Sequence, residues 1–148
     1  MARIRRIVHP TDFSPASAPA SKKALELAKD NKATLVTVHV LPTLPVIGDA
    51  YIPPATIDEM LRAQRAQGEK SMQRLVSRAR AAGVRVSGFV LDNGAVADAI
   101  ARFAKRQKAD LLVMGTHGHG ILARALLGSV AERVMSKAPC PVMVVRGK

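Results

Sequence analysis

The chain has 148 residues, 48% of them hydrophobic and 23% charged, which is the size of one domain (residues 1–148) with a single core. No apolar run approaches the ~20 residues that a membrane-spanning helix needs, so we expect a soluble protein without membrane insertion. His9, Pro10 and Asp12 interrupt the start of the chain before any long apolar stretch, which does not fit an export signal. Cys140 is the only cysteine, which excludes an internal disulfide and favours a cytoplasmic protein.

The net charge is strongly positive. Lys and Arg number 23 against 11 acidic residues, giving a formal charge of +12. This balance suggests an anionic partner such as a nucleotide, a nucleic acid or a membrane surface. Aromatic residues make up only 3% of the chain and Trp is absent, which argues against a stacking platform for single-stranded nucleic acid.

The first third of the chain reads as strand, helix and strand. Residues 4–8 form a short β-branched run that predicts a strand. Ser14 and Pro15 are an N-cap and a first-turn proline for a helix over 14–30. The β-branched run 33–40 then predicts the second strand, which ends before Pro42.

A proline-rich loop and a long helix follow. Residues 42–55 contain four prolines and cannot form a regular helix. Thr56 and Glu59 have the spacing of a capping box, so the helix is expected to begin there and to end at Gly83. The long loop has two interpretations: a lid over a bound ligand, or a segment that packs against a partner subunit.

The rest of the chain continues the alternation. The pattern predicts strands over 84–91, 110–114 and 141–145, and helices over 96–103 and 129–137. Five strands alternating with helices predict an α/β fold, a doubly wound, Rossmann-like parallel sheet with helices on both faces. Ligands of such sheets bind beyond the carboxyl ends of the strands, so the loops after the first and fourth strands are the candidate site.

The loop after the fourth strand carries a glycine motif. Gly115, Gly118, Gly128 and Ser129 form the pattern G-x-x-G-x9-G-S. Glycines let phosphate groups approach the backbone amides, and Ser129 begins a helix whose N-terminus favours an anion. The alternative is that the glycines only turn the chain and the serine only caps a helix. The fixed spacing in the expected place favours a phosphate site.

The loop after the first strand supplies a second candidate. Asp12 would point into the same crevice, where its carboxylate could bind ribose hydroxyls or a metal ion. Alternatively, Asp12 or Ser14 only caps the following helix, and for Ser14 we favour that capping role.

These segments resemble the universal stress protein family. The similarity is carried by IRRIVHPTDFSPAS, VTVHVL, VMGTHGHG, LLGSVAERVM and CPVMVVR, and it covers nearly the whole chain except the proline-rich loop and the helix after it. It implies the branch of the family that keeps the glycine motif and binds ATP, with Mg²⁺ or Mn²⁺ reaching Asp12 through the nucleotide. It also implies the strand order 3-2-1-4-5 and a homodimer through the exposed edge of strand 141–145, an edge that proteins normally cover or pair.

The resemblance assigns the nucleotide contacts by position. Adenine and ribose are expected near Pro10, Thr11, Asp12 and the backbone of Val40, the nucleotide lies along Met114, Gly115 and Gly118, and the phosphates are held by Gly128, Ser129 and Val130. His117, a variable position of the motif, could neutralise phosphate when protonated, or could simply be solvated.

A basic segment remains unexplained by the motif. It comprises Arg62, Arg65, Lys70, Arg74, Arg78, Arg80 and Arg85. Such a face could meet nucleic acid or anionic lipid, or could be simply solvated, and we favour the latter.

The leading hypothesis is an ATP-binding regulatory module of a stress response that acts with unidentified protein partners. Hydrolysis is expected to be slow or absent, because no clear base and charge clamp for the γ-phosphate is readable. The sequence has no P-loop, and Asp12 lacks the paired acids of a phosphoacceptor domain, so a phosphotransfer enzyme is disfavoured. Nucleic-acid binding through the basic helix 62–85 is the remaining alternative.

Overall fold

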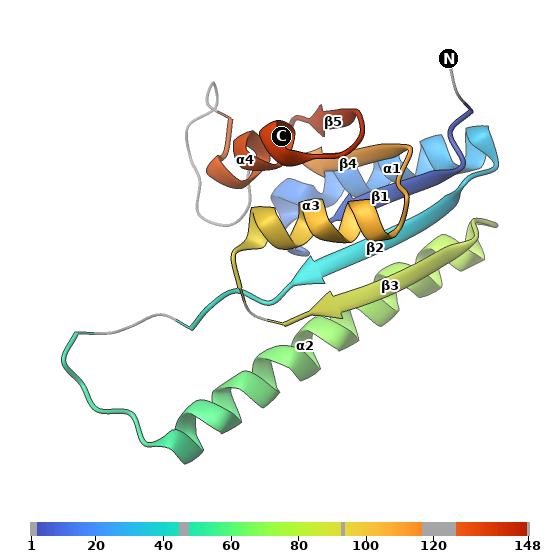
Figure 1. Ribbon diagram of the computed structural model, residues 1–148. Helices are drawn as coiled ribbons and strands as arrows, with labels where there is room; N and C mark the ends of the chain where they lie inside the picture. The colour runs from blue at the N-terminus through green and yellow to red at the C-terminus, as the bar shows by residue number, and fades with distance from the viewer. Residues whose placement is uncertain (1–2, 45–47, 93, 117–126, 148) are drawn as a thin grey trace.

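The computed structural model describes residues 3–44, 48–92, 94–116 and 127–147. Its elements alternate along the chain (Figure 1). They are β1 (Arg6–Pro10), the 3₁₀ turn η1 (Pro15–Ser17), α1 (Ala18–Asn31), β2 (Thr34–Val40), α2 (Pro54–Ala81), β3 (Val86–Leu91), α3 (Val96–Arg106), β4 (Leu111–Gly115), α4 (Ser129–Lys137) and β5 (Val142–Val145). The five strands are all parallel in the order β3-β2-β1-β4-β5, which confirms the predicted α/β sheet.

The helices cover both faces of the sheet. α1 and α2 pack with Ile7, Leu35 and Val113 on one face, while α3 and α4 pack with neighbouring residues such as Val8 and Leu112 on the other. Successive residues of a strand point to opposite faces, so both faces of β1 and β4 are apolar. None of the described helices is both long and apolar enough to cross a bilayer.

β1 begins and ends two residues later than the 4–8 pattern predicts. Asp110 explains the start, because its carboxylate accepts hydrogen bonds from the backbone amides of Arg5 (2.8 Å) and Arg6 (2.9 Å). At the other end the ladder runs past Pro10, since a proline lacks only its own donor. The Thr11 amide donates to the Val38 carbonyl at 2.9 Å and continues the pairing with β2.

The structure corrects the predicted start of the long helix. α2 begins at Pro54 with Pro53 as its N-cap and without a capping side chain, so the capping box at Thr56 and Glu59 is wrong. The Pro53 carbonyl instead accepts from the Thr56 amide at 3.0 Å. Proline in the first turn has a helical φ and no amide that needs a partner, which lets the helix start earlier.

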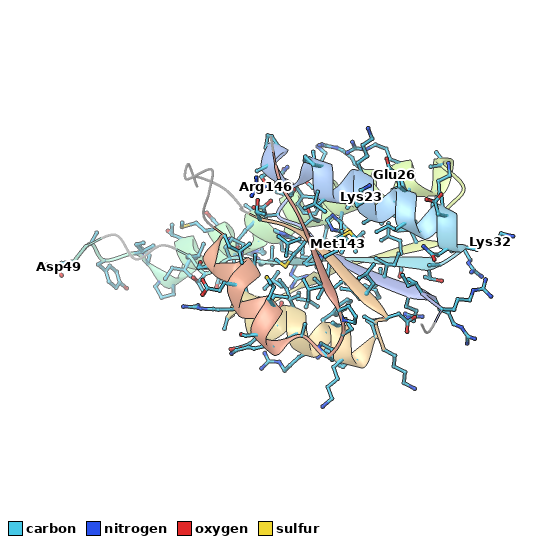
Figure 2. All side chains as sticks on the ribbon, turned by 90° about the horizontal axis from the view of Figure 1, so that it is seen from above. Lys23, Glu26, Lys32, Asp49, Met143 and Arg146 are labelled. Atoms are coloured by element: carbon cyan, nitrogen blue, oxygen red, sulfur yellow. The ribbon has the colours of Figure 1, made fainter. Side chains whose placement is uncertain are left out.

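The described part of the proline-rich loop extends away from the sheet. Tyr51 is 82% exposed, and Asp49 lies far from the strands (Figure 2). The helix after it is buried only from Gly68 onward, so the first turns of α2 project with the loop.

The close approach of α2 to β3 depends on Gly88. A Cβ atom at this position would lie 2.6 Å from Met72 Cγ, 2.7 Å from Met72 Sδ and 2.8 Å from Val76 Cγ2. Met72 and Val76 are both buried on the side of α2 that faces the sheet. The helix can therefore pack this closely against β3 only because Gly88 has no side chain.

We predict that Gly88→Ala lowers the free energy of unfolding by about 1–3 kcal/mol, because the added methyl overpacks this contact. Gly94→Ala is the matched control, since a Cβ atom there meets nothing within 4 Å. Urea unfolding of the two variants measures the difference. Equal stability of both variants would contradict the role assigned to Gly88.

Candidate functional site

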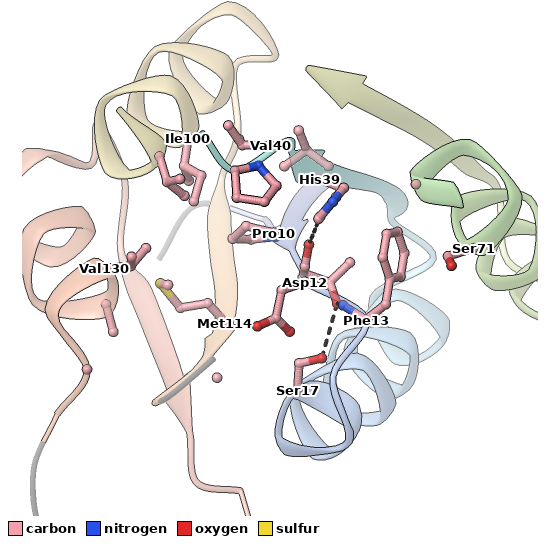
Figure 3. Close-up of a pocket in the computed structure, with 18 of the residues that line it drawn as sticks. Pro10, Asp12, Phe13, Ser17, His39, Val40, Ser71, Ile100, Met114 and Val130 are labelled. Atoms are coloured by element: carbon pink, nitrogen blue, oxygen red, sulfur yellow. Dashed lines mark hydrogen bonds between the residues drawn. The ribbon is translucent and has the colours of Figure 1, made fainter. Parts of the chain in front are cut away.

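A cavity of about 730 Å³ opens at the carboxyl ends of the central strands. β1 and β4 are neighbours in the sheet, but the helices that follow them lie on opposite faces. α1 follows β1 on one face, and α4 follows β4 on the other. A gap at this reversal of strand order is where ligands of doubly wound sheets bind. Figure 3 shows side chains from the β1 loop, β2, α2, α3, β4 and α4 arranged around it.

Most of the site residues expected from the sequence line this one cavity. They are Pro10, Thr11, Asp12, Val40, Met114, Gly115, Gly128, Ser129 and Val130. His117 and Gly118 lie outside the described residues. The cavity therefore joins two segments that are about a hundred residues apart in the chain.

Hydrogen bonds fix the loop that follows β1. Asp12 Oδ1 accepts from the Ser14 amide at 2.9 Å, and Ser14 Oγ accepts from the Ser17 amide at 3.3 Å. Ser14 is therefore a cap, as expected, but it caps the turn η1, whereas α1 begins only at Ala18 with Ser17 as its N-cap. Thr11 Oγ1 accepts from the Phe13 amide at 3.0 Å and lies 3.2 Å from Ser17 Oγ. The Asp12 carboxylate points toward the side of the cavity where Met114 lies (Figure 3).

His39 and Phe13 also line the cavity, although the sequence reasoning missed them as site residues. The His39 Nδ1–H donates to the Thr11 carbonyl at 2.8 Å, and its ring centroid lies 4.7 Å from that of Phe13. Phe13 has a left-handed φ of 63°, so the loop turns sharply at this residue. A polar residue inside the apolar strand TLVTVHV, close to its carboxyl end, is a signal that could have identified His39.

One wall of the cavity is apolar. It is formed by Val40, Val96, Ile100, Met114 and Val130. Ile100 and Val96 come from successive turns of α3, and Met114 is the penultimate residue of β4. A wall of this kind suits a flat, weakly polar ring better than a charged group.

The start of α4 offers backbone amides. Gly128 is the N-cap of α4 and has no side chain that could cap the helix, and its own amide donates to the Thr116 carbonyl at 2.7 Å. The first-turn amides, beginning at Ser129, face the end of β4, and a helix N-terminus of this kind favours an anion. Among the described residues no group of three His, Cys, Asp or Glu is arranged to hold a metal ion.

A buried histidine ties β1, β4 and α1 together beneath the site. His9 is 1% exposed, and its Nδ1–H donates to the Val113 carbonyl at 2.8 Å. Its Nε2 therefore accepts from the Ser21 hydroxyl, also at 2.8 Å. Burial lowers the pKa of His9 and outweighs the opposite effect of the bond to Val113, so the imidazole is neutral.

Comparison with known proteins places this architecture in a family. The model of the universal stress protein family matches residues 3–146. The chain belongs to the universal stress protein family. A universal stress protein of Methanocaldococcus jannaschii is 39% identical over 143 residues, covering 96% of this chain and 82% of that protein.

Solved universal stress proteins share the fold. UspA from Lactobacillus plantarum superposes with a TM-score of 0.80 at 26% identity, covering 99% of this chain and 100% of that one. A universal stress protein in complex with cAMP has a TM-score of 0.70 and 27% identity, and the match covers 98% of each chain. The fold thus occurs in a family member that holds a nucleotide.

We predict that stability falls as the pH drops below the ordinary histidine pKa of 6.5. In that range the unfolded chain binds a proton that folded, neutral His9 does not, so the free energy of unfolding decreases by up to ~1.4 kcal/mol per pH unit. The loss ends once the pH reaches the lowered pKa of the folded state.

His9→Asn removes this titration but keeps a donor for the Val113 carbonyl. Urea unfolding between pH 7.5 and 5 is expected to give a shallower pH dependence for the variant than for the wild type. Parallel curves for the two proteins would show that His9 is not the titrating group.

Proposed function

We propose that this universal stress protein binds ATP in the cavity at the carboxyl ends of β1 and β4, and acts as a nucleotide-dependent regulatory module in a stress response. The main support is the convergence of the Asp12 loop with the turn from Gly128 to Val130 on one cavity. The complex of a related family member with cAMP supports an adenine nucleotide as the ligand class.

The chemistry of the walls suits the parts of ATP. The apolar side chains around Val40 and Ile100 would contact the adenine, and Asp12 would accept hydrogen bonds from the ribose hydroxyls. The amides at the start of α4 and the Ser129 hydroxyl would receive the phosphates. Gly115 and Gly128 leave the backbone open to that approach, in agreement with the glycine motif.

A divalent cation fits the same residues. Asp12 is the one carboxylate among the described residues that line the cavity. Mg²⁺ in nucleotide sites takes one or two carboxylates and completes its shell with phosphate oxygens and water, so a single Asp is sufficient. When bound, Mg²⁺ or Mn²⁺ would neutralise phosphate charge. We propose signalling by occupancy, with hydrolysis slow or absent, because ATP turnover needs a positioned base and a charge clamp.

The decisive measurement is calorimetry on nucleotide-stripped protein, with chromatography of the material that is stripped off. We expect one ATP per chain, tighter binding with Mg²⁺ present, and weaker binding of AMP, which lacks the phosphates that α4 would hold. Absence of ATP binding under both conditions would refute the proposal and make the basic surface of α2 the better lead.

Asp12→Asn tests the cation separately from the nucleotide. The amide keeps an oxygen for the Ser14 amide and the ribose but loses the charge that attracts Mg²⁺. We expect affinity for Mg²⁺-ATP to fall about tenfold, equivalent to ~1.4 kcal/mol, and affinity for metal-free ATP to change little. Asp30→Asn, an exposed change of the same charge at the end of α1, is the control. Equal losses with and without Mg²⁺ would contradict the metal role.

We also propose a homodimer through the free edge of β5. Within the part of the chain that the structure describes, this strand pairs only with β4, and Met143 is 37% exposed on it (Figure 2). The Pro141 and Val145 carbonyls accept from β4, so by alternation the backbone groups of Val142 and Val144 point to the free edge. An isologous pairing would satisfy them.

Val144→Pro removes one outward amide, whereas Val144→Thr keeps it. Sedimentation analysis is expected to show a dimer for the wild type and for Val144→Thr, and a shift toward monomer for Val144→Pro. Circular dichroism verifies that the proline variant remains folded. A wild-type monomer, or a dimer unaffected by proline, would refute this interface.

A further inference from the structure

A second cavity, of about 420 Å³, lies between α1 and α2. α1 packs mainly over β1 and β4, whereas α2 packs mainly over β3, so the two helices leave a gap above β1 and β2. We call this space the α1–α2 groove. It is lined by residues of β1, the loop after it, β2 and both helices.

The interior of the groove is suited to an apolar group. Leu25, Leu35, Leu75 and Ala79 supply hydrocarbon surface from both helices and from β2. The polar groups at its base are already engaged, since Thr37 donates its hydroxyl within the protein, to Met72 Sδ (3.0 Å) or the Ser87 carbonyl (3.2 Å). His9 is likewise held by Val113 and Ser21. A ligand buried here gains by hydrophobic contact more than by hydrogen bonding.

The long side chains lining the groove are cationic. Lys22 comes from α1, and Arg74 and Arg78 come from one face of α2. None of the described residues that line the groove is acidic, and Asp12 lines only the neighbouring cavity. The ion pairs found in the described part of the chain involve other basic residues. Arg74 and Arg78 are also one turn apart, a like-charge spacing that destabilises a helix. An anion between these three cations would relieve that repulsion.

We propose that the α1–α2 groove is a second ligand site, which takes a small amphipathic anion: an apolar acyl or aryl body ended by a single carboxylate. The apolar body lies over Leu35 between the helices, and the carboxylate is held by Lys22, Arg74 and Arg78. Lys22, Arg74 and Arg78 are exposed at the mouth of the groove, where they can meet the carboxylate while the apolar body lies inside.

The groove is distinct from the nucleotide cavity but borders it. The two cavities share Thr11, Phe13, Ser17 and Ser71 as lining residues. In Figure 3 the Phe13 ring stands between the Asp12 side of the nucleotide cavity and Ser71 of α2. The Phe13 ring lines both spaces, so we expect the two ligands to lie on either side of it and to be bound at once.

The test uses sodium decanoate, below its micelle concentration, on nucleotide-stripped protein in a calorimeter. Acetate carries the head group without the apolar body, and 1-decanol carries the body without the charge. We expect saturable decanoate binding at one site per chain, at least about tenfold weaker binding of decanol, and no measurable binding of acetate. No decanoate binding, or equal affinity for decanol, would overturn the proposal.

Charge variants locate the site. Arg74→Gln combined with Arg78→Gln is expected to weaken decanoate binding about tenfold or more. Arg62→Gln combined with Arg80→Gln makes the same change in net charge on exposed positions of α2 outside both cavities, and is expected to leave the affinity unchanged. Equal losses in both double variants would show unspecific attraction by the basic surface and overturn the assignment.

A final experiment tests whether decanoate binds in the groove or in the nucleotide cavity. With saturating ATP present, decanoate is still expected to bind. Complete displacement by ATP would place decanoate in the nucleotide cavity and overturn the proposal. If the protein fails to bind ATP, the titrations without ATP still decide whether the groove is a site, so the two proposals fail independently.

Discussion

The position of β1 between β2 and β4 is the constraint on which the site depends. Parallel strands must be joined by crossover connections, and each crossover runs over a single face of the sheet. The connections through α1 and α2 lie on one face, and those through α3 and α4 lie on the other. α1 therefore covers one face near β1 while α4 covers the opposite face near β4. Among the described elements no helix lies across the carboxyl ends between them. The cavity at the carboxyl ends of β1 and β4 is a consequence of the order of the strands, and the side chains at its edges determine what it binds.

The sequence predicts the architecture well because its signals are local. Strands buried on both faces require continuous β-branched runs such as TLVTVHV, and the helices between them show a 3.6-residue period. Even the sites of turns follow from single residues, as with Gly83 at its φ of 87°. The start of α2 is different, because two start signals lie close together: the proline pair Pro53–Pro54 and the capping box that begins at Thr56. The spacing of the residues does not show which of the two signals is stronger. There the fixed φ of proline prevails.

The candidate site is less predictable where it depends on distances between elements. Asp12 and the described glycines can be found from their motif, but His39 and Phe13 line the cavity only because their rings meet across the loop after β1. The α1–α2 groove has no signature at all in the sequence. Its existence follows from the spacing of two helices that pack over different strands, which is a tertiary quantity.

The excess positive charge is not one uniform surface. Arg65 pairs with Glu69 and Asp92, and the Arg85 guanidinium donates to the Lys32 carbonyl at 3.0 Å. These two side chains are engaged in holding α2 and the start of β3 in place. Arg74 and Arg78 instead line the groove, so residues of one basic run have different surroundings. A single electrostatic role for the whole run, such as a nucleic-acid face, does not follow from its composition.

The loop from Thr11 to Ser17 links these features energetically. A left-handed φ at a phenylalanine costs about 1–2 kcal/mol, and the contact with His39 together with the Thr11 and Ser17 hydrogen bonds holds Phe13 in that conformation. The same ring is a wall of both cavities. A ligand on either side that contacts the ring changes the balance between this strain and its restraints. Binding free energies couple reciprocally. If one ligand changes the affinity for the other through Phe13, the second ligand changes the affinity for the first by the same factor. For the two proposed ligands, the strained Phe13 would therefore be a physical connection between their sites within a single small sheet.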